Sequence, residues 1–121
     1  MSPALAVTLD GGDTYSPGDA VRGSVTVSEG GRSRRLEVCL TYNEQTANLS
    51  HSVVRGTSGQ LAEGELEQGA SYPFELQVPD DALPGARSPN GELYWEVDAK
   101  SDELGPDTHA RARISVEPRR R

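Results

Sequence analysis

The chain of 121 residues contains only one cysteine, one methionine, one lysine and six aromatic residues. Because Cys39 stands alone, the chain can form no internal disulfide and no site with several cysteine ligands. No apolar run approaches the roughly 20 residues that a helical membrane span requires. Residues 1–8 also lack the charged and apolar regions of a signal peptide. We therefore expect a soluble, cytoplasmic protein.

Acidic residues outnumber basic residues by nineteen to twelve, which gives a net charge of −7. A chain this acidic is not expected to bind nucleic acid. Basic residues are concentrated in the last part of the sequence, residues 111–121, which includes five arginines and one glutamate. We interpret residues 119–121, all arginine, as a basic tail. Such a tail leaves open a peripheral contact with an acidic partner or an anionic membrane surface.

Apolar and polar residues alternate along most of the chain, a pattern typical of strands with one buried face. The clearest alternating runs are residues 4–9, 20–27, 36–43, 72–78, 93–99 and 110–116, with weaker runs at 50–55 and 60–67. Gly, Pro and Asp separate these runs, and residues 28–33 are expected to form a hairpin loop. About eight short strands without a helical period predict an all-β fold, a two-sheet antiparallel immunoglobulin-like sandwich over residues 1–118.

The alternation also predicts which side chains face the core. Trp95 is in phase with Leu93 and Val97, so we expect it to pack between the sheets. Tyr94 falls on the opposite face and is predicted to be an exposed aromatic residue that could anchor a contact. Cys39 lies opposite the inward residues of its own strand, which favours a free, inert thiol.

Several segments resemble arrestin-like domains. Residues 15–25 read Tyr-Ser-Pro-Gly-Asp-Ala-Val-Arg-Gly-Ser-Val, similar to the segment Tyr-x-Pro-Gly-Glu-x-Val-x-Gly-x-Val of that family. Residues 74–79 with Leu83-Pro84, and then residues 91–99, follow in the family's order. The end of the chain is similar to the bacterial sporulation-control proteins of this superfamily. The resemblance implies an arrestin-like sandwich of a single lobe that acts in scaffolding and in regulation of sporulation or trafficking.

The matching residues have structural roles. Pro17 and Gly18 favour a sharp turn, because proline fixes φ and glycine tolerates positive φ. Gly23 within a strand indicates a bulge or a close backbone approach, and Pro84 interrupts pairing where the chain crosses between sheets. The motif residues are Tyr15, Pro17, Gly18, Gly23, Phe74, Pro79, Pro84 and Trp95. Arrestin-like proteins usually have two lobes, so a homodimer or a second lobe from another chain remains open.

The sequence shows no pattern typical of an enzyme or of a cofactor site. No nucleophile has a recognisable base, no glycine-rich loop opens a helix, and no HExxH motif is present. His51 and His109 have no partners at metal-ligand spacing. Asp10, Asp13 and Asp19 lie in loops of the kind that bind calcium, but aspartate is also an ordinary turn former, so they are weak candidates.

The glutamates at positions 63, 65 and 67 alternate, so we expect them on one face of a strand. They indicate either a solvated strand that discourages edge pairing or an acidic docking face for a basic partner. With Tyr94, these three are the predicted partner-binding residues.

We expect a non-enzymatic adaptor or regulator that acts through protein contacts, in sporulation or stress regulation. An extended partner segment would add to a sheet edge at residues 60–67 or 5–9. The alternatives are a small module that binds calcium or a carbohydrate in its Asp-rich loops, and a structural subunit that self-associates.

Overall fold

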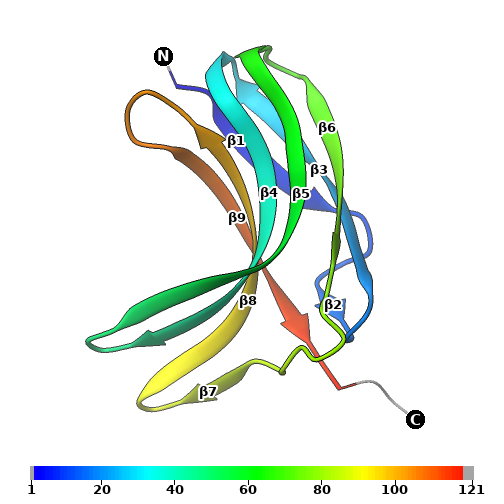
Figure 1. Cartoon of the computed structure of the whole chain (residues 1–121), viewed down its shortest axis with the longest axis vertical. Coiled ribbons are helices and arrows are strands. Elements are labelled where there is room, and N and C mark those ends of the chain that lie inside the picture. Colours follow the sequence, from blue (N-terminus) through cyan, green and yellow to red (C-terminus); the bar gives the residue numbers. More distant parts are fainter. Residues whose placement is uncertain (1, 119–121) are drawn as a thin grey trace.

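The computed structural model describes residues 2–118, which form nine strands in two packed sheets (Figure 1). The strands are β1 (Ala4–Leu9), β2 (Thr14–Tyr15), β3 (Ala20–Glu29), β4 (Gly31–Thr46), β5 (Ser50–Leu66), β6 (Ser71–Gln77), β7 (Ala86–Ser88), β8 (Gly91–Asp102) and β9 (Thr108–Val116). The smaller sheet has the order β1-β3-β6; the larger has the order β2-β9-β8-β4-β5, with β7 paired to β8. The predicted all-β, two-sheet sandwich is confirmed. The predicted tail, residues 119–121, lies outside the described residues.

All strand pairs are antiparallel except one that the sequence did not predict. Thr14 and Tyr15 form the two-residue strand β2, which runs parallel to the end of β9. The carbonyl oxygen of Asp13 accepts a hydrogen bond from the backbone N–H of Ser115 at 2.7 Å, and that of Tyr15 accepts one from Glu117 at 2.8 Å. The segment after β1 is thereby tied to the larger sheet before the chain returns to the smaller one as β3.

The expected hairpin loop at residues 28–33 is wrong. β3 pairs with β1 and β6, whereas β4 pairs with β5 and β8, so the step from Glu29 to Gly31 is a crossing between sheets. Gly30 lies at the crossing, and a Cβ atom there would approach the carbonyl oxygen of Leu66 to 2.9 Å. A Gly-Gly pair marks a tight chain reversal in either case, so local sequence could not tell a hairpin from a crossing.

The two weak strands predicted at 50–55 and 60–67 are one continuous strand, β5, interrupted by irregularities of pairing. Gly59 has φ of 74° and Gly64 has φ of 90°. Next to Gly59, side chains replace ladder bonds: the Ser58 hydroxyl accepts from the N–H of Val38 at 2.9 Å, and the Thr57 hydroxyl accepts from the N–H of Gly59 at 3.1 Å. These irregularities look like a strand end in the sequence because they break the period of two.

The core lies between the two sheets and consists mostly of valine and leucine. The buried apolar residues are Tyr15, Val21, Val25, Val27, Leu36, Val38, Leu40, Leu66, Phe74, Leu76, Val78, Ala82, Trp95, Val97, Ala99, Ile114 and Val116. Trp95 is 1% exposed, as predicted, and its Nε1–H donates to the carbonyl oxygen of Leu83 at 2.7 Å. Tyr42 is half-buried, with its ring centroid 4.7 Å from that of Trp95.

The family-like turn forms as the sequence predicts. Gly18 has φ of 88°, and its N–H donates to the carbonyl oxygen of Val78 at 2.9 Å. The backbone N–H of Ser16 donates to the carboxylate of Asp19 at 2.8 Å. Gly23 marks a close approach, because a Cβ atom there would clash with the carbonyl oxygen of Thr8 and with the Phe74 ring. The segment between β6 and β7, which contains Leu83-Pro84, crosses from the smaller to the larger sheet as expected.

The larger sheet extends beyond the smaller one. In Figure 1 the β4–β5 and β7–β8 hairpins sweep away from the body of the sandwich, and the larger sheet bends so that its outer face is concave. β5 and β1 are edge strands of their sheets, as predicted for these segments. The part of the chain that the structure describes has no helix long and apolar enough to cross a membrane.

Candidate functional site

A hollow of about 590 Å³ lies on the concave outer face of the larger sheet. Its residues come from the polar positions of β4, β5, β8 and β9. They are Glu37, Cys39, Thr41, Asn43, Ser50, Ser52, Val54, Tyr94, Glu96, Asp98, Lys100, His109 and Arg111. Because side chains alternate along each strand, the residues that line the hollow lie between the core residues in sequence.

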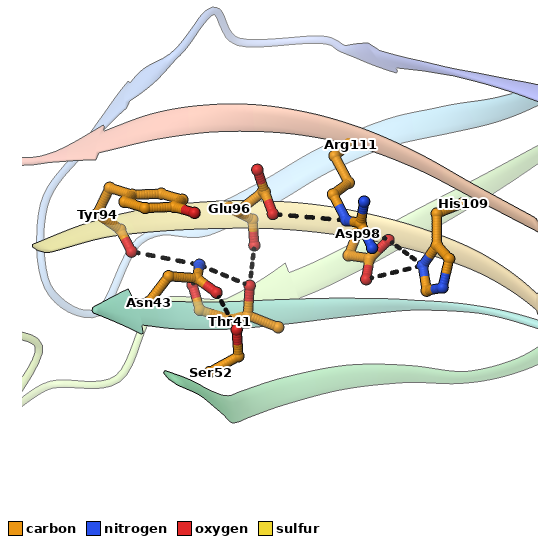
Figure 2. A network of polar contacts seen from close by, with 8 residues as sticks. All are labelled: Thr41, Asn43, Ser52, Tyr94, Glu96, Asp98, His109 and Arg111. Atoms are coloured by element: carbon orange, nitrogen blue, oxygen red, sulfur yellow. Dashed lines mark hydrogen bonds and ion pairs between the residues drawn. The ribbon is translucent and has the colours of Figure 1, made fainter. Parts of the chain in front are cut away.

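The floor of the hollow is a hydrogen-bonded group centred on Asn43, which is 5% exposed (Figure 2). The Asn43 side-chain amide donates to the Thr41 hydroxyl at 3.0 Å and to the carbonyl oxygen of Tyr94 at 3.4 Å. Its amide oxygen accepts from the Ser52 hydroxyl. Thr41 donates in turn to the carbonyl oxygen of Glu96 at 3.3 Å. The group links three strands, so the shape of the floor is fixed by the fold.

Acidic side chains of β8 lie beside basic side chains of the neighbouring strand β9 (Figure 2). Asp98 lies 3.0 Å from Nδ1 of His109 and 3.6 Å from Nε of Arg111. The same Arg111 nitrogen lies 3.7 Å from the carboxylate of Glu96. The side chains of Glu96 and Asp98 are only 16% exposed. The Arg111 side chain is 52% exposed, so each of its ion pairs joins a sheltered carboxylate to a guanidinium that solvent reaches.

Tyr94 belongs to this face but is half-buried, which corrects the prediction of an exposed aromatic residue. The guanidinium of Arg113 lies 3.8 Å from the centroid of the Tyr94 ring, a cation–π contact. Arg113 is held there by the carboxylate of Glu92 at 3.0 Å. The hydrogen bond to Glu92 raises the pKa of Arg113. The sequence could not reveal this cover, because it depends on which strand pairs with β8.

Burial alters the acid–base properties of two groups in the hollow. It raises the pKa of the Glu96 carboxyl, and the opposing effect of Arg111 is smaller. Burial also raises the pKa of the Cys39 thiol, and the negative charge of Glu37 adds to the effect. A raised thiol pKa leaves less thiolate at neutral pH, so Cys39 is a poor nucleophile.

The three predicted partner-binding glutamates do not line the hollow. All three are exposed; Glu63 and Glu65 lie on β5 and Glu67 follows it. Glu65 lies opposite Arg32, with 4.0 Å between the charged atoms. In the structure these glutamates lie apart from Tyr94, the fourth predicted partner-binding residue. Their role in binding a partner stays a prediction.

The three aspartates considered for calcium do not form a metal site. Among residues 2–118, no group of three or more His, Cys, Asp or Glu side chains is placed to hold a metal ion. Asp19 instead accepts the backbone hydrogen bond within its turn, and Asp13 accepts from the Thr14 hydroxyl at 3.3 Å. Burial, together with the negative charge of Asp10, Asp13 and Asp19, raises the pKa of Tyr15.

Sequence reasoning missed Asn43 and Thr41 as members of a site. A signal was present, because both alternate with Leu40 and Tyr42 and are in phase with Cys39. In the sequence alone, that phase indicates the solvent-exposed face of a strand. Only the bend of the sheet and the neighbouring strands shelter these side chains, and neither appears in a one-strand pattern.

The two packed sheets, the crossings between them and the bent larger sheet make this an arrestin-like β-sandwich. Among solved structures, the chain is similar to Spo0M, a sporulation control protein from Bacillus subtilis, with a TM-score of 0.73 and 20% sequence identity. The similarity covers 97% of this chain and 50% of that protein, so this chain spans about half its length. No protein-family model matches the sequence, and no curated protein matches it. The resemblance noted in the sequence is thus confirmed for the fold.

Proposed function

We propose that this chain is a non-enzymatic regulatory protein that acts in the cytoplasm by binding another protein, in sporulation or stress regulation. The observation that carries the proposal is the concave face, where a hydrogen-bonded polar floor and ion pairs with sheltered carboxylates line the hollow. Similarity to a sporulation control protein supports the regulatory setting. Proteins that share a fold differ in function, so the proposal depends on the concave face more than on the fold.

The chemistry of the hollow favours binding over catalysis. Its strongest potential nucleophile, Cys39, has a raised pKa. The Ser52 hydroxyl donates to the Asn43 amide and not to a base that could activate it. Glu96 and Asp98 are paired with Arg111, and Asp98 also contacts His109, an arrangement that suits the recognition of a polar surface.

The charges suggest what a partner must supply. Glu96 and Asp98 on β8 carry negative charge, whereas Arg111 on β9 carries the positive charge that pairs with both. A partner segment with both basic and acidic side chains could exchange these pairs one for one as it enters. The exposed glutamates at 63, 65 and 67 offer a separate surface that fits a purely basic partner. The two surfaces therefore predict different partners and can be tested apart.

The test is affinity capture from the native host with four tagged baits, followed by mass spectrometry. The baits are the native chain, Tyr94→Ala with Arg111→Gln, the triple Glu→Lys change at 63, 65 and 67, and a control triple Glu29→Lys, Asp80→Lys and Glu117→Lys. The control changes three exposed carboxylates elsewhere and alters the net charge equally.

A protein that the native and control baits recover and the Tyr94/Arg111 bait loses would support the concave face. If only the Glu63/Glu65/Glu67 bait fails to recover the protein, binding is assigned to the surface formed by these three glutamates. If all four baits recover the same proteins equally, neither surface binds the partner and the proposal fails.

A further inference from the structure

Residues 45–54 form the longest stretch of the chain without Asp, Glu, Lys or Arg, in a protein with a net charge of −7. The stretch covers the end of β4, the turn and the start of β5, at the tip of the projecting hairpin (Figure 1). Leu49, Val53 and Val54 are 53%, 43% and 60% exposed. They are three of the five exposed large hydrophobic residues described. Three of these five residues are therefore gathered on one hairpin that carries no Asp, Glu, Lys or Arg.

The edge of β5 is regular only in this hairpin. Pairing with β4 runs without a shift from Thr41–Val54 to Gln45–Ser50. Further along, the bulges at Gly59 and Gly64 and the charges of Glu63 and Glu65 obstruct the edge. Bulges and charges are the devices that prevent strand addition, and residues 49–54 have neither. We call these six residues the neutral edge.

The neutral edge is also clear of the rest of the molecule. At Gly56 the strand faces the carbonyl oxygen of Gln77 in β6, where a Cβ atom would lie 3.6 Å away. Arg55 is bound to Asp81 at 2.9 Å. Beyond these contacts the hairpin leaves the smaller sheet, and β5 is the last strand of its own sheet.

We propose that the neutral edge pairs antiparallel with the neutral edge of a second copy of this chain, which joins the two larger sheets into one. The acidic surface repels a second copy elsewhere, whereas the hairpin brings no like charges together and holds the two bodies apart. A two-fold axis at Ser52 would place Ser50 of one chain opposite Val54 of the other, with Leu49 facing Arg55 just outside the segment. The inference does not require the partner proposed for the concave face, but the two surfaces adjoin, because Ser50, Ser52 and Val54 also line the hollow.

The test is the mass of the purified full chain over a wide range of concentration, measured by sedimentation velocity. The edge variant is Leu49→Lys with Val54→Lys. The control is Leu83→Lys with Leu104→Lys, which alters two other exposed leucines, 63% and 94% exposed, and adds the same charge. Circular dichroism checks that both variants fold. We expect the native and control chains to dimerise with rising concentration. The dissociation constant of the edge variant's dimer should be higher by about tenfold or more.

Hydrogen exchange locates the interface. Amides within residues 49–54 are expected to gain protection as the concentration of the native chain rises, and not in the edge variant. A chain that stays monomeric throughout overturns the proposal. A dimer that the edge variant forms equally well, or whose protected amides lie elsewhere, overturns it too.

Discussion

The two faces of β8 are built from adjacent residues and are stabilised in different ways. On the inner face, Trp95, Val97 and Ala99 are at most 1% exposed and belong to the apolar core. On the outer face, Tyr94, Glu96 and Asp98 are half-buried, and each is matched to a cation on β9. The inner face is stabilised by close packing of apolar side chains, and the outer face by contacts with arginine side chains. The contacts of the outer face can therefore be exchanged for contacts with a partner.

The largest difference between the faces is expected from truncation of adjacent aromatic residues. Trp95→Ala should lower the free energy of unfolding by about 3–5 kcal/mol, because it leaves a cavity in the core. Tyr94→Ala should cost about 1 kcal/mol, since it mainly loses the contact with Arg113. Urea unfolding followed by far-ultraviolet circular dichroism measures both without relying on tryptophan fluorescence. Equal losses would contradict the distinction between the faces.

A smaller effect is expected where the outer face is most buried. Asn43→Ala should lower the free energy of unfolding by about 1–3 kcal/mol, because the hydroxyls of Thr41 and Ser52 lose their partner. Asn48→Ala, in the exposed turn between β4 and β5, is the matched control and should change stability by less than about 0.5 kcal/mol. If the two variants unfold at the same urea concentration, the floor of the hollow is not a structural unit.

The smallest effect concerns pH and Glu96. Folding raises the pKa of Glu96, so the folded chain binds its proton more tightly than the unfolded chain does. The contribution of Glu96 to stability is therefore full below its unfolded pKa and is lost as pH rises through its folded pKa. Glu96→Gln removes this dependence, so the variant should gain stability relative to the native chain as pH rises from about 4, near the usual pKa of glutamate. Thermal unfolding across that range measures the difference, and a change of opposite sign would show that Arg111 dominates the environment of Glu96.

Much of the fold could be predicted because the period of two survives in most strands. β1, β3, β6, β8 and β9 fall where alternation placed them, and Trp95 is in the core as its neighbours indicated. Pattern reasoning failed at the crossing through Gly30 and in the bulged part of β5. In both places the backbone conformation depends on segments far away in the sequence.

The candidate site was predictable only in part. Tyr94 was identified as an outward residue of β8, yet its cover by Arg113 was not, and Asn43 was missed entirely. The acidic run at 63, 65 and 67 drew attention because like charges stand out in a sequence. Charges of opposite sign on β8 and β9 do not stand out in the net charge of the sequence. They become a candidate site only because the fold places them side by side.

The sequence by itself determined the sandwich: the turn at Pro17-Gly18, the inward alternation of valine and leucine, and a neutral segment in an acidic chain. These features depend on neighbouring residues or on the charge of a segment, so they can be identified from the sequence of that segment alone. The tertiary structure decided which strands are neighbours, how the larger sheet bends and which polar side chains that bend shelters. Those outcomes follow from contacts between residues far apart in the chain, whose free energy exists only once both sheets have packed.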